Sequence, residues 1–257
     1  MASKIGLLLC GHGSRVAAAN REFEQVAGSI AERLRQFDVE RGYLEFAKPT
    51  ILEGLEALHA KGNTRILAVP GILFAAGHLK SDIPAILSDY MARHGDVQIE
   101  LGRELGIDPK MLGAAAARIR AAIGAAEMDV SPQQSVLVVV GRGASDPGAN
   151  ANIFTAMRAL WQDLSFAWGE VAFSGVTFPL VEPALEHAAR LGYRRVVVFP
   201  YILFTGVLVK GVRESIDRVA SRHPAIDFVA ADHFKDHPLI AETLIDRVNE
   251  LLGGATN

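Results

Sequence analysis

The fold is decided by the stretch Ile5-Gly6-Leu7-Leu8-Leu9-Cys10-Gly11-His12-Gly13, a short apolar run that ends in a glycine-rich turn. The same arrangement returns 130 residues later, where Val136–Val140 leads into Gly141-Arg142-Gly143. Short apolar runs that end at glycine are typical of strands buried on both faces of a sheet. We therefore expect two copies of one unit, each opening with a buried strand.

Further matches at this offset extend the repeat over about seventy residues. The matching pairs are Pro49 and Pro179, Leu55-Glu56 and Leu185-Glu186, Gly62 and Gly192, Arg65 and Arg195, Pro70 and Pro200, Ile72-Leu73-Phe74 and Ile202-Leu203-Phe204, and Lys80 and Lys210. Because chance does not hold one offset over that distance, we interpret the chain as a duplicated half. The stretch 125–135 has no apolar period and contains Pro132, so the predicted domains are 1–125 and 126–257.

Within each half, short apolar runs alternate with amphipathic segments. The expected strands are 5–10, 43–46, 66–69, 97–101, 136–140, 171–177, 196–199 and 228–231, and the expected helices of the first half fall near 23–37, 50–61, 81–94 and 109–123. Strands that alternate with helices need crossover connections, which give parallel sheets with helices on both faces. The predicted fold class is α/β, with two similar doubly wound domains related by duplication. We expect the active cleft between them.

Composition limits the classes of function that remain. The 257 residues are 50% hydrophobic and 21% charged, which is typical of a globular protein. A formal net charge of −3 gives no general attraction for nucleic acid or for an anionic membrane, so neither is a predicted partner. Cys10 is the sole cysteine, which excludes a disulfide framework and multi-cysteine metal sites. The first apolar run is too short for a signal peptide or a membrane span, so we expect a cytoplasmic protein.

Side chains that can bind a metal follow the first three expected strands. His12 follows the first strand, Glu45 closes the second, and His78 comes after the third in a glycine-containing loop. Parallel strands end at one edge of the sheet, so these groups can converge there. Imidazole and carboxylate ligands suit Zn, Co, Ni or Fe, and so small a ligand set leaves the coordination sphere open. The trio predicts a metal site.

The second copy has lost this chemistry, because Arg142, Gly175 and Leu208 stand at the three matching positions. A histidine after a strand is by itself more often an ordinary loop residue, so the functional interpretation depends on the trio together and on its absence from the repeat. One equipped copy indicates one active half, with the other half forming a wall of the cleft.

Basic residues lie near the same strand ends. They are Arg15, Lys48, Lys80, Arg142 and Lys210. Each alone is typical of a solvated surface, but together they suit a polyanionic ligand. Nucleotide chemistry is not expected, because the chain has no Walker A run and no Gly-x-Gly-x-x-Gly that opens a helix.

Three segments resemble the class II tetrapyrrole chelatases of the CbiX type, the sirohydrochlorin chelatases of cobalamin and sirohaem synthesis. The segments are Leu8-Leu9-Cys10-Gly11-His12-Gly13-Ser14-Arg15, Tyr43-Leu44-Glu45-Phe46-Ala47-Lys48-Pro49, and Val69-Pro70 followed by Leu73-Phe74-Ala75-Ala76-Gly77-His78-Leu79-Lys80-Ser81-Asp82-Ile83-Pro84. The whole chain is similar to the long, two-domain form. The resemblance implies a chelatase-like fold, metal-handling roles for His12 and His78, and a role for Glu45 as the strand-end acid.

The resemblance also implies an ATP-independent reaction with no cofactor beyond the substrate metal. Inserting M²⁺ expels two pyrrole protons, for which Glu45 or a histidine free of the metal is the expected acceptor. The basic residues would pair carboxylates of the ring, and the product could pass to the next enzyme of the pathway. We expect cobalt, with iron or nickel as alternatives that ligand type cannot separate. A non-catalytic tetrapyrrole or metal carrier is the alternative from another class.

Overall fold

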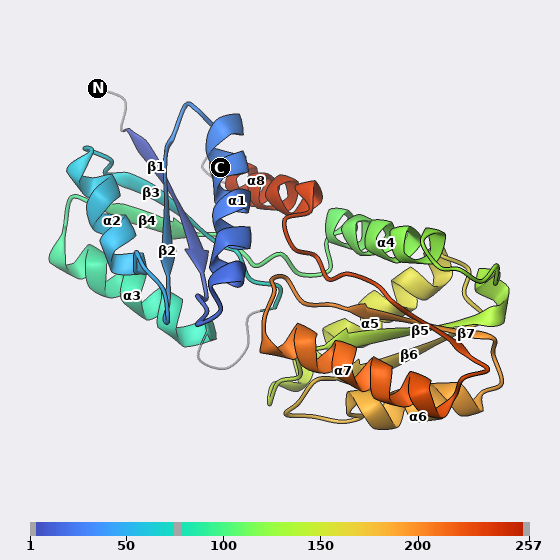
Figure 1. The fold of residues 1–257 in the computed structure, drawn as a ribbon. Helices are drawn as coiled ribbons and strands as arrows, with labels where there is room; N and C mark the ends of the chain where they lie inside the picture. Colours follow the sequence, from blue (N-terminus) through green and yellow to red (C-terminus); the bar gives the residue numbers. More distant parts are fainter. Residues whose placement is uncertain (1–3, 75–78, 254–257) are drawn as a thin grey trace. The chain divides into compact units, whose positions relative to one another are not determined.

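The computed structural model describes residues 4–74 and 79–253. The chain forms two compact units, which we call unit 1 (Met1–Lys110 with Asp236–Asn257) and unit 2 (Met111–Lys235) (Figure 1). Within the described ranges, no helix has the length and apolar character needed to cross a bilayer.

Unit 1 is built on a four-stranded parallel sheet in the order β2-β1-β3-β4. Its strands are β1 (Ile5–Gly11), β2 (Asp38–Tyr43), β3 (Arg65–Pro70) and β4 (Gln98–Leu101). Its helices are α1 (Ala17–Arg33), α2 (Ile51–Ala60), α3 (Leu79–Arg93) and α8 (Pro238–Gly253). The predicted strand 43–46 is wrong in its bounds, because β2 ends at Tyr43 and Glu45 lies in the following turn.

Unit 2 repeats this arrangement, with the strand order β6-β5-β7-β8 and every pair parallel. Its strands are β5 (Ser135–Gly141), β6 (Trp168–Phe173), β7 (Arg195–Pro200) and β8 (Asp227–Ala230). Its helices are α4 (Pro109–Gly124), the short 3-10 helix η1 (Pro132–Gln134), α5 (Pro147–Asp163), α6 (Val181–Arg190) and α7 (Val207–Arg222). The predicted α/β fold with duplicated parallel sheets is confirmed, although β6 begins and ends earlier than the predicted strand 171–177.

Helices cover both faces of each sheet (Figure 1). In β1, Leu8 and Cys10 pack with residues of α2 and α3, while Leu7 and Leu9 are equally buried and alternation turns them to the opposite face. α8 packs there against α1 and β3. Apolar residues at every position of the central strand are therefore required, which explains the unbroken apolar run in the sequence.

The compact units differ from the predicted division at residue 125. The chain leaves unit 1 after Lys110 and returns at Asp236, so the last helix of each repeat belongs to the unit formed by the other repeat. The division at 125 follows the sequence repeat, whereas the units follow packing. An amphipathic helix buries its apolar face against whichever sheet it reaches, and its sequence does not specify which.

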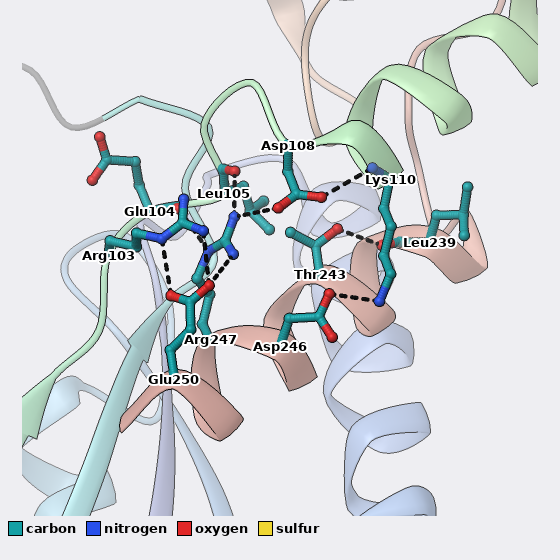
Figure 2. A network of polar contacts seen from close by, with 10 residues as sticks. All are labelled: Arg103, Glu104, Leu105, Asp108, Lys110, Leu239, Thr243, Asp246, Arg247 and Glu250. Atoms are coloured by element: carbon teal, nitrogen blue, oxygen red, sulfur yellow. Dashed lines mark hydrogen bonds and ion pairs between the residues drawn. The ribbon is translucent and has the colours of Figure 1, made fainter. Parts of the chain in front are cut away.

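A buried arginine fastens α8 within unit 1 (Figure 2). Only 1% of the Arg247 side chain is exposed, and its guanidinium donates to the carbonyls of Glu104 (3.1 Å) and Leu105 (2.9 Å) and to Asp108 Oδ2 (2.9 Å). Burial raises the pKa of the Asp108 carboxyl, but the Lys110 N–H and the Arg247 guanidinium outweigh this and hold that pKa below its ordinary value. The charge of Arg247 is thus balanced where it is buried.

Unit 2 holds α4 by a matching bond, in which Arg118 Nη2 donates to the carbonyl of Phe234 (2.8 Å). Arg118 and Arg247 stand 129 residues apart, as do Leu105 and Phe234, whose carbonyls accept these bonds. The same helix anchor therefore occurs in both units, at an offset one residue shorter than the earlier repeat.

Candidate active site

Backbone pairing continues beyond the ends of β1 and β2 and brings His12 beside Glu45. Gly11 lies opposite Tyr43 in the sheet register. The N–H of Leu44 then donates to the Gly11 carbonyl (2.9 Å), and the N–H of Glu45 donates to the His12 carbonyl (3.0 Å). Two of the predicted site residues are thus held at the carboxyl ends of neighbouring strands, where ligands of such sheets bind.

Gly13 allows the two loops to approach each other. Its φ is +88°, and a Cβ there would lie 1.8 Å from the Glu45 carbonyl oxygen. Gly143 repeats this feature, with φ of +87° and a Cβ position 1.9 Å from the Gly175 carbonyl oxygen. Any larger residue at either position would force the loops apart.

His12 and Glu45 form a pair with one defined geometry. His12 Nδ1 lies 3.0 Å from the Gly13 carbonyl oxygen, which only accepts, so Nδ1 is the donor of this contact; in the neutral tautomer with that proton, Nε2 is an acceptor. Nε2 lies 3.3 Å from Glu45 Oε1, and the two side chains are 35% and 45% exposed. Two acceptors that face each other are satisfied by a proton or a cation. Two ligands bound at about 2.05 Å to a tetrahedral ion also lie ~3.3 Å apart.

The third predicted ligand, His78, lies outside the described residues. Among residues 4–74 and 79–253, no group of three or more His, Cys, Asp or Glu side chains could hold a metal ion. Cys10 is fully buried directly before the turn, and burial raises the pKa of its thiol to about 12. The thiol is therefore protonated at neutral pH.

Phe46 is a site residue that the sequence analysis missed. Its ring is 50% exposed, its φ is +61°, and its centroid lies 6.3 Å from that of the His12 ring. The guanidinium carbon of Arg15 lies 4.7 Å from the same ring centroid. The signal that could have found it is the repeat, because the matching residue Val176 is also apolar, has φ of +67° and is 75% exposed.

The basic candidates differ in how their charge is used. Arg15 is exposed and forms no ion pair with any described residue, so its donors are available. Lys48 Nζ lies 2.5 Å from Glu53 Oε1, and this contact with the N–H and hydroxyl of Thr50 lowers the pKa of Glu53 to about 2. Lys80 is exposed in the first turn of α3. Arg15 is thus the basic candidate that contacts Phe46, the residue directly after Glu45.

Unit 2 presents a different surface at its matching edge. Arg142 is exposed after β5, and Lys210 is 77% exposed on α7 with its Nζ 3.6 Å from Glu214 Oε1. Also in unit 2, Val176, Phe178 and Val207 are 75%, 79% and 74% exposed. Unit 2 therefore has the basic Arg142 at the position of His12, Gly175 at that of Glu45 and the apolar Val176 at that of Phe46.

These features define a duplicated α/β protein in which an imidazole and a carboxylate meet at the strand edge of unit 1. The chain matches the CbiX family over residues 6–122 and 136–251, and it belongs to that family. It is 33% identical over 253 residues to the sirohydrochlorin cobaltochelatase of Priestia megaterium, covering 96% of this chain and 80% of that protein. It is 31% identical over 256 residues to the sirohydrochlorin ferrochelatase of the same organism, covering 98% and 91%.

Solved structures agree with this assignment. The structure of SirB from Bacillus subtilis with Fe³⁺ superposes with a TM-score of 0.87 at 26% identity, covering 98% of this chain and 97% of that one. The resemblance stated from the sequence motifs is therefore confirmed for the family, the two-domain form and the fold.

Proposed function

We propose that this protein is a sirohydrochlorin chelatase that inserts Co²⁺ without ATP, as a step of cobalamin synthesis. The observation that carries the proposal is the separation of 3.3 Å between His12 Nε2 and Glu45 Oε1, with His12 Nδ1 facing the Gly13 carbonyl oxygen. Membership of the CbiX family and the names of the two Priestia megaterium relatives support the substrate.

In this proposal, His12 and Glu45 hold the metal ion together with His78. Few protein ligands compete with the four ring nitrogens, so the ion can pass to the ring by ligand exchange. Each M²⁺ that enters displaces two pyrrole protons, which keeps the charge balanced. Glu45, or a histidine that has released the metal, accepts them, since a carboxylate and a neutral imidazole are both proton acceptors.

Ring binding uses carboxylate recognition. A guanidinium or ammonium group pairs a carboxylate by charge-assisted hydrogen bonds, and Arg15 lies over the ring of Phe46, which itself lies 6.3 Å from the His12 ring. Lys48 is a weaker candidate because Glu53 already balances its charge. Lys80, Arg142 and Lys210 remain candidates, and the product could be handed to the next enzyme of the pathway.

Iron insertion for sirohaem is the second candidate, favoured by the ferrochelatase relative and by the neighbour solved with Fe³⁺. Nickel uses the same ligand types. A carrier that binds ring or metal without turnover is the candidate from another class.

An anaerobic absorbance assay separates these candidates. Substoichiometric protein is mixed with sirohydrochlorin and Co²⁺, Fe²⁺ or Ni²⁺, each with a protein-free control. Multiple turnovers with the greatest acceleration for Co²⁺ are expected, whereas the greatest acceleration for Fe²⁺ would replace cobalt by iron. One equivalent of bound ring without acceleration would make the protein a carrier.

Matched variants connect the activity to the site. His12→Ala and Glu45→Gln should lower kcat by at least about a hundredfold, because each removes a proposed metal ligand. His187→Ala is the control, since that histidine is 59% exposed on α6 of unit 2 and contacts Glu170. Turnover of His12→Ala at the wild-type rate would contradict the proposed role of the pair.

A further inference from the structure

Phe46 occupies a backbone position where glycine would be unstrained. A bulky residue at φ of +61° is an outlier, and such positions persist where the surroundings or function demand the side chain. Unit 2 repeats the feature with Val176 at φ of +67°, although a glycine stands directly before it at 175. Both copies therefore keep an exposed apolar side chain at this turn despite its cost.

In unit 1 that side chain supports a cation. The guanidinium carbon of Arg15 lies 4.7 Å from the ring centroid of Phe46, inside the range of about 6 Å over which a ring face attracts a cation. The N–H donors of a guanidinium point outward in its own plane. A guanidinium that rests on a ring face thus keeps its donor edge open for a carboxylate.

The same ring adjoins the metal-competent pair. The His12 ring lies 6.3 Å from the Phe46 ring at an interplanar angle of 33°, and Phe46 directly follows Glu45. Phe46 therefore lies between the Arg15 guanidinium, which can bind a carboxylate at the rim of a tetrapyrrole, and the His12 side chain, which can release a metal ion at the centre of the tetrapyrrole.

We propose that Phe46 is a positioning residue that holds the Arg15 guanidinium beside His12 and Glu45, where it binds a rim carboxylate of the tetrapyrrole. This inference rests on the proposed function for its ligand. It assigns no chemical step to Phe46, which acts through Arg15 on substrate affinity and not on the metal.

Metal-free sirohydrochlorin is titrated into the full-length protein by absorbance. Arg15→Ala should raise Kd on the order of tenfold, as expected for loss of a charge-assisted pair at a partly exposed site. Phe46→Leu should raise Kd about two- to fivefold, and Phe46→Tyr should restore affinity because it restores a ring face. Phe154→Leu is the matched control, since Phe154 is 49% exposed on α5.

The double variant gives the sharpest result. If Phe46 acts through Arg15, then Arg15→Ala combined with Phe46→Leu should bind the ring no more weakly than Arg15→Ala alone. Co²⁺ titrated alone should bind Phe46→Leu as it binds the wild type. Three results would overturn the inference. The increases in Kd could multiply in the double variant, Phe46→Leu and Phe46→Tyr could weaken ring binding equally, or Phe46→Leu could bind the ring with wild-type affinity.

Its failure is distinct from failure of the proposed function. If the wild type inserts metal but the effects of Arg15 and Phe46 on ring affinity are independent, only the proposed role of Phe46 is refuted. If the wild type inserts no metal and the ring titration still shows the coupling, the chelatase proposal falls and the binding role of Phe46 stands.

Discussion

Replacing Gly13 by alanine should separate the two loops that carry His12 and Glu45. The new Cβ would lie 1.8 Å from the Glu45 carbonyl oxygen, and real contacts of this kind are not shorter than 3.0 Å. The loops must therefore move by more than 1 Å, whereas metal ligands tolerate about 0.2 Å. The hydrogen bond from the Glu45 N–H to the His12 carbonyl, 3.0 Å long, cannot survive that movement unchanged.

The expected cost has two parts. An L-residue at φ of +88° loses ~1–2 kcal/mol, and the weakened backbone hydrogen bond adds ~1 kcal/mol. Lower entropy of the unfolded chain returns about 0.5–1 kcal/mol. The free energy of unfolding should thus fall by roughly 2 kcal/mol, and Co²⁺ affinity should fall about 10- to 100-fold, as is typical when the groups that orient a ligand are disturbed.

Gly143→Ala is the matched control, because its Cβ would lie 1.9 Å from the Gly175 carbonyl oxygen at φ of +87°. Both variants are measured by urea denaturation and by calorimetric titration with Co²⁺. Similar losses of stability are expected, with weakened Co²⁺ binding for Gly13→Ala alone. If both variants bind Co²⁺ like the wild type, or both lose it equally, the assignment of the ion to His12 and Glu45 is refuted.

Three further outcomes are expected. Arg247→Met should lower the free energy of unfolding by ~3–5 kcal/mol in urea denaturation, because it leaves the largely buried Asp108 carboxylate without its partner; a loss below about 1 kcal/mol would contradict this. The Cys10 thiol, with its pKa raised to about 12, should resist a thiol reagent at pH 8 in the native protein and react once urea unfolds it; rapid native labelling would count against its burial. Lys48→Met should raise the pKa of Glu53 from about 2 toward its ordinary value in an NMR titration. A lowered pKa stabilises the fold above the unfolded pKa, and this contribution is lost as pH falls toward the folded pKa. The variant should therefore lose less stability on acidification than the wild type; an unmoved pKa would refute the pairing.

The parallel sheets were predictable because their central strands contain short apolar runs that are buried on both faces. The bounds of β2 were not, since Asp38–Tyr43 is an edge strand with only its last two residues buried, and its apolar signal is weak. The second strand was therefore predicted at the next apolar residues, 43–46, and this placed Glu45 inside the strand. The convergence of His12 and Glu45 still followed, because parallel strands end at one edge.

α4 belongs to unit 2 and α8 to unit 1, each apart from the other helices of its own repeat. Periodicity could not predict this, because it reveals the apolar face of a helix but not the sheet that covers that face. The Arg118 and Arg247 anchors were hidden for a related reason. The two arginines stand 129 residues apart, whereas the other matching pairs of the repeat stand 130 apart. Phe46 could not be identified from the sequence, because its backbone angle and its contact with Arg15 do not follow from its residue type.

The late return of the chain to unit 1 determines the order in which the protein can be completed during synthesis. Unit 2 is one continuous segment, Met111–Lys235, which leaves the ribosome before α8 exists. The first residues of unit 1 are synthesised first and its helix α8 after all of unit 2. α1 and β3 therefore stay uncovered by α8 until that helix has been made. A single cut at the repeat boundary would therefore separate α8 from the rest of unit 1 and α4 from the rest of unit 2.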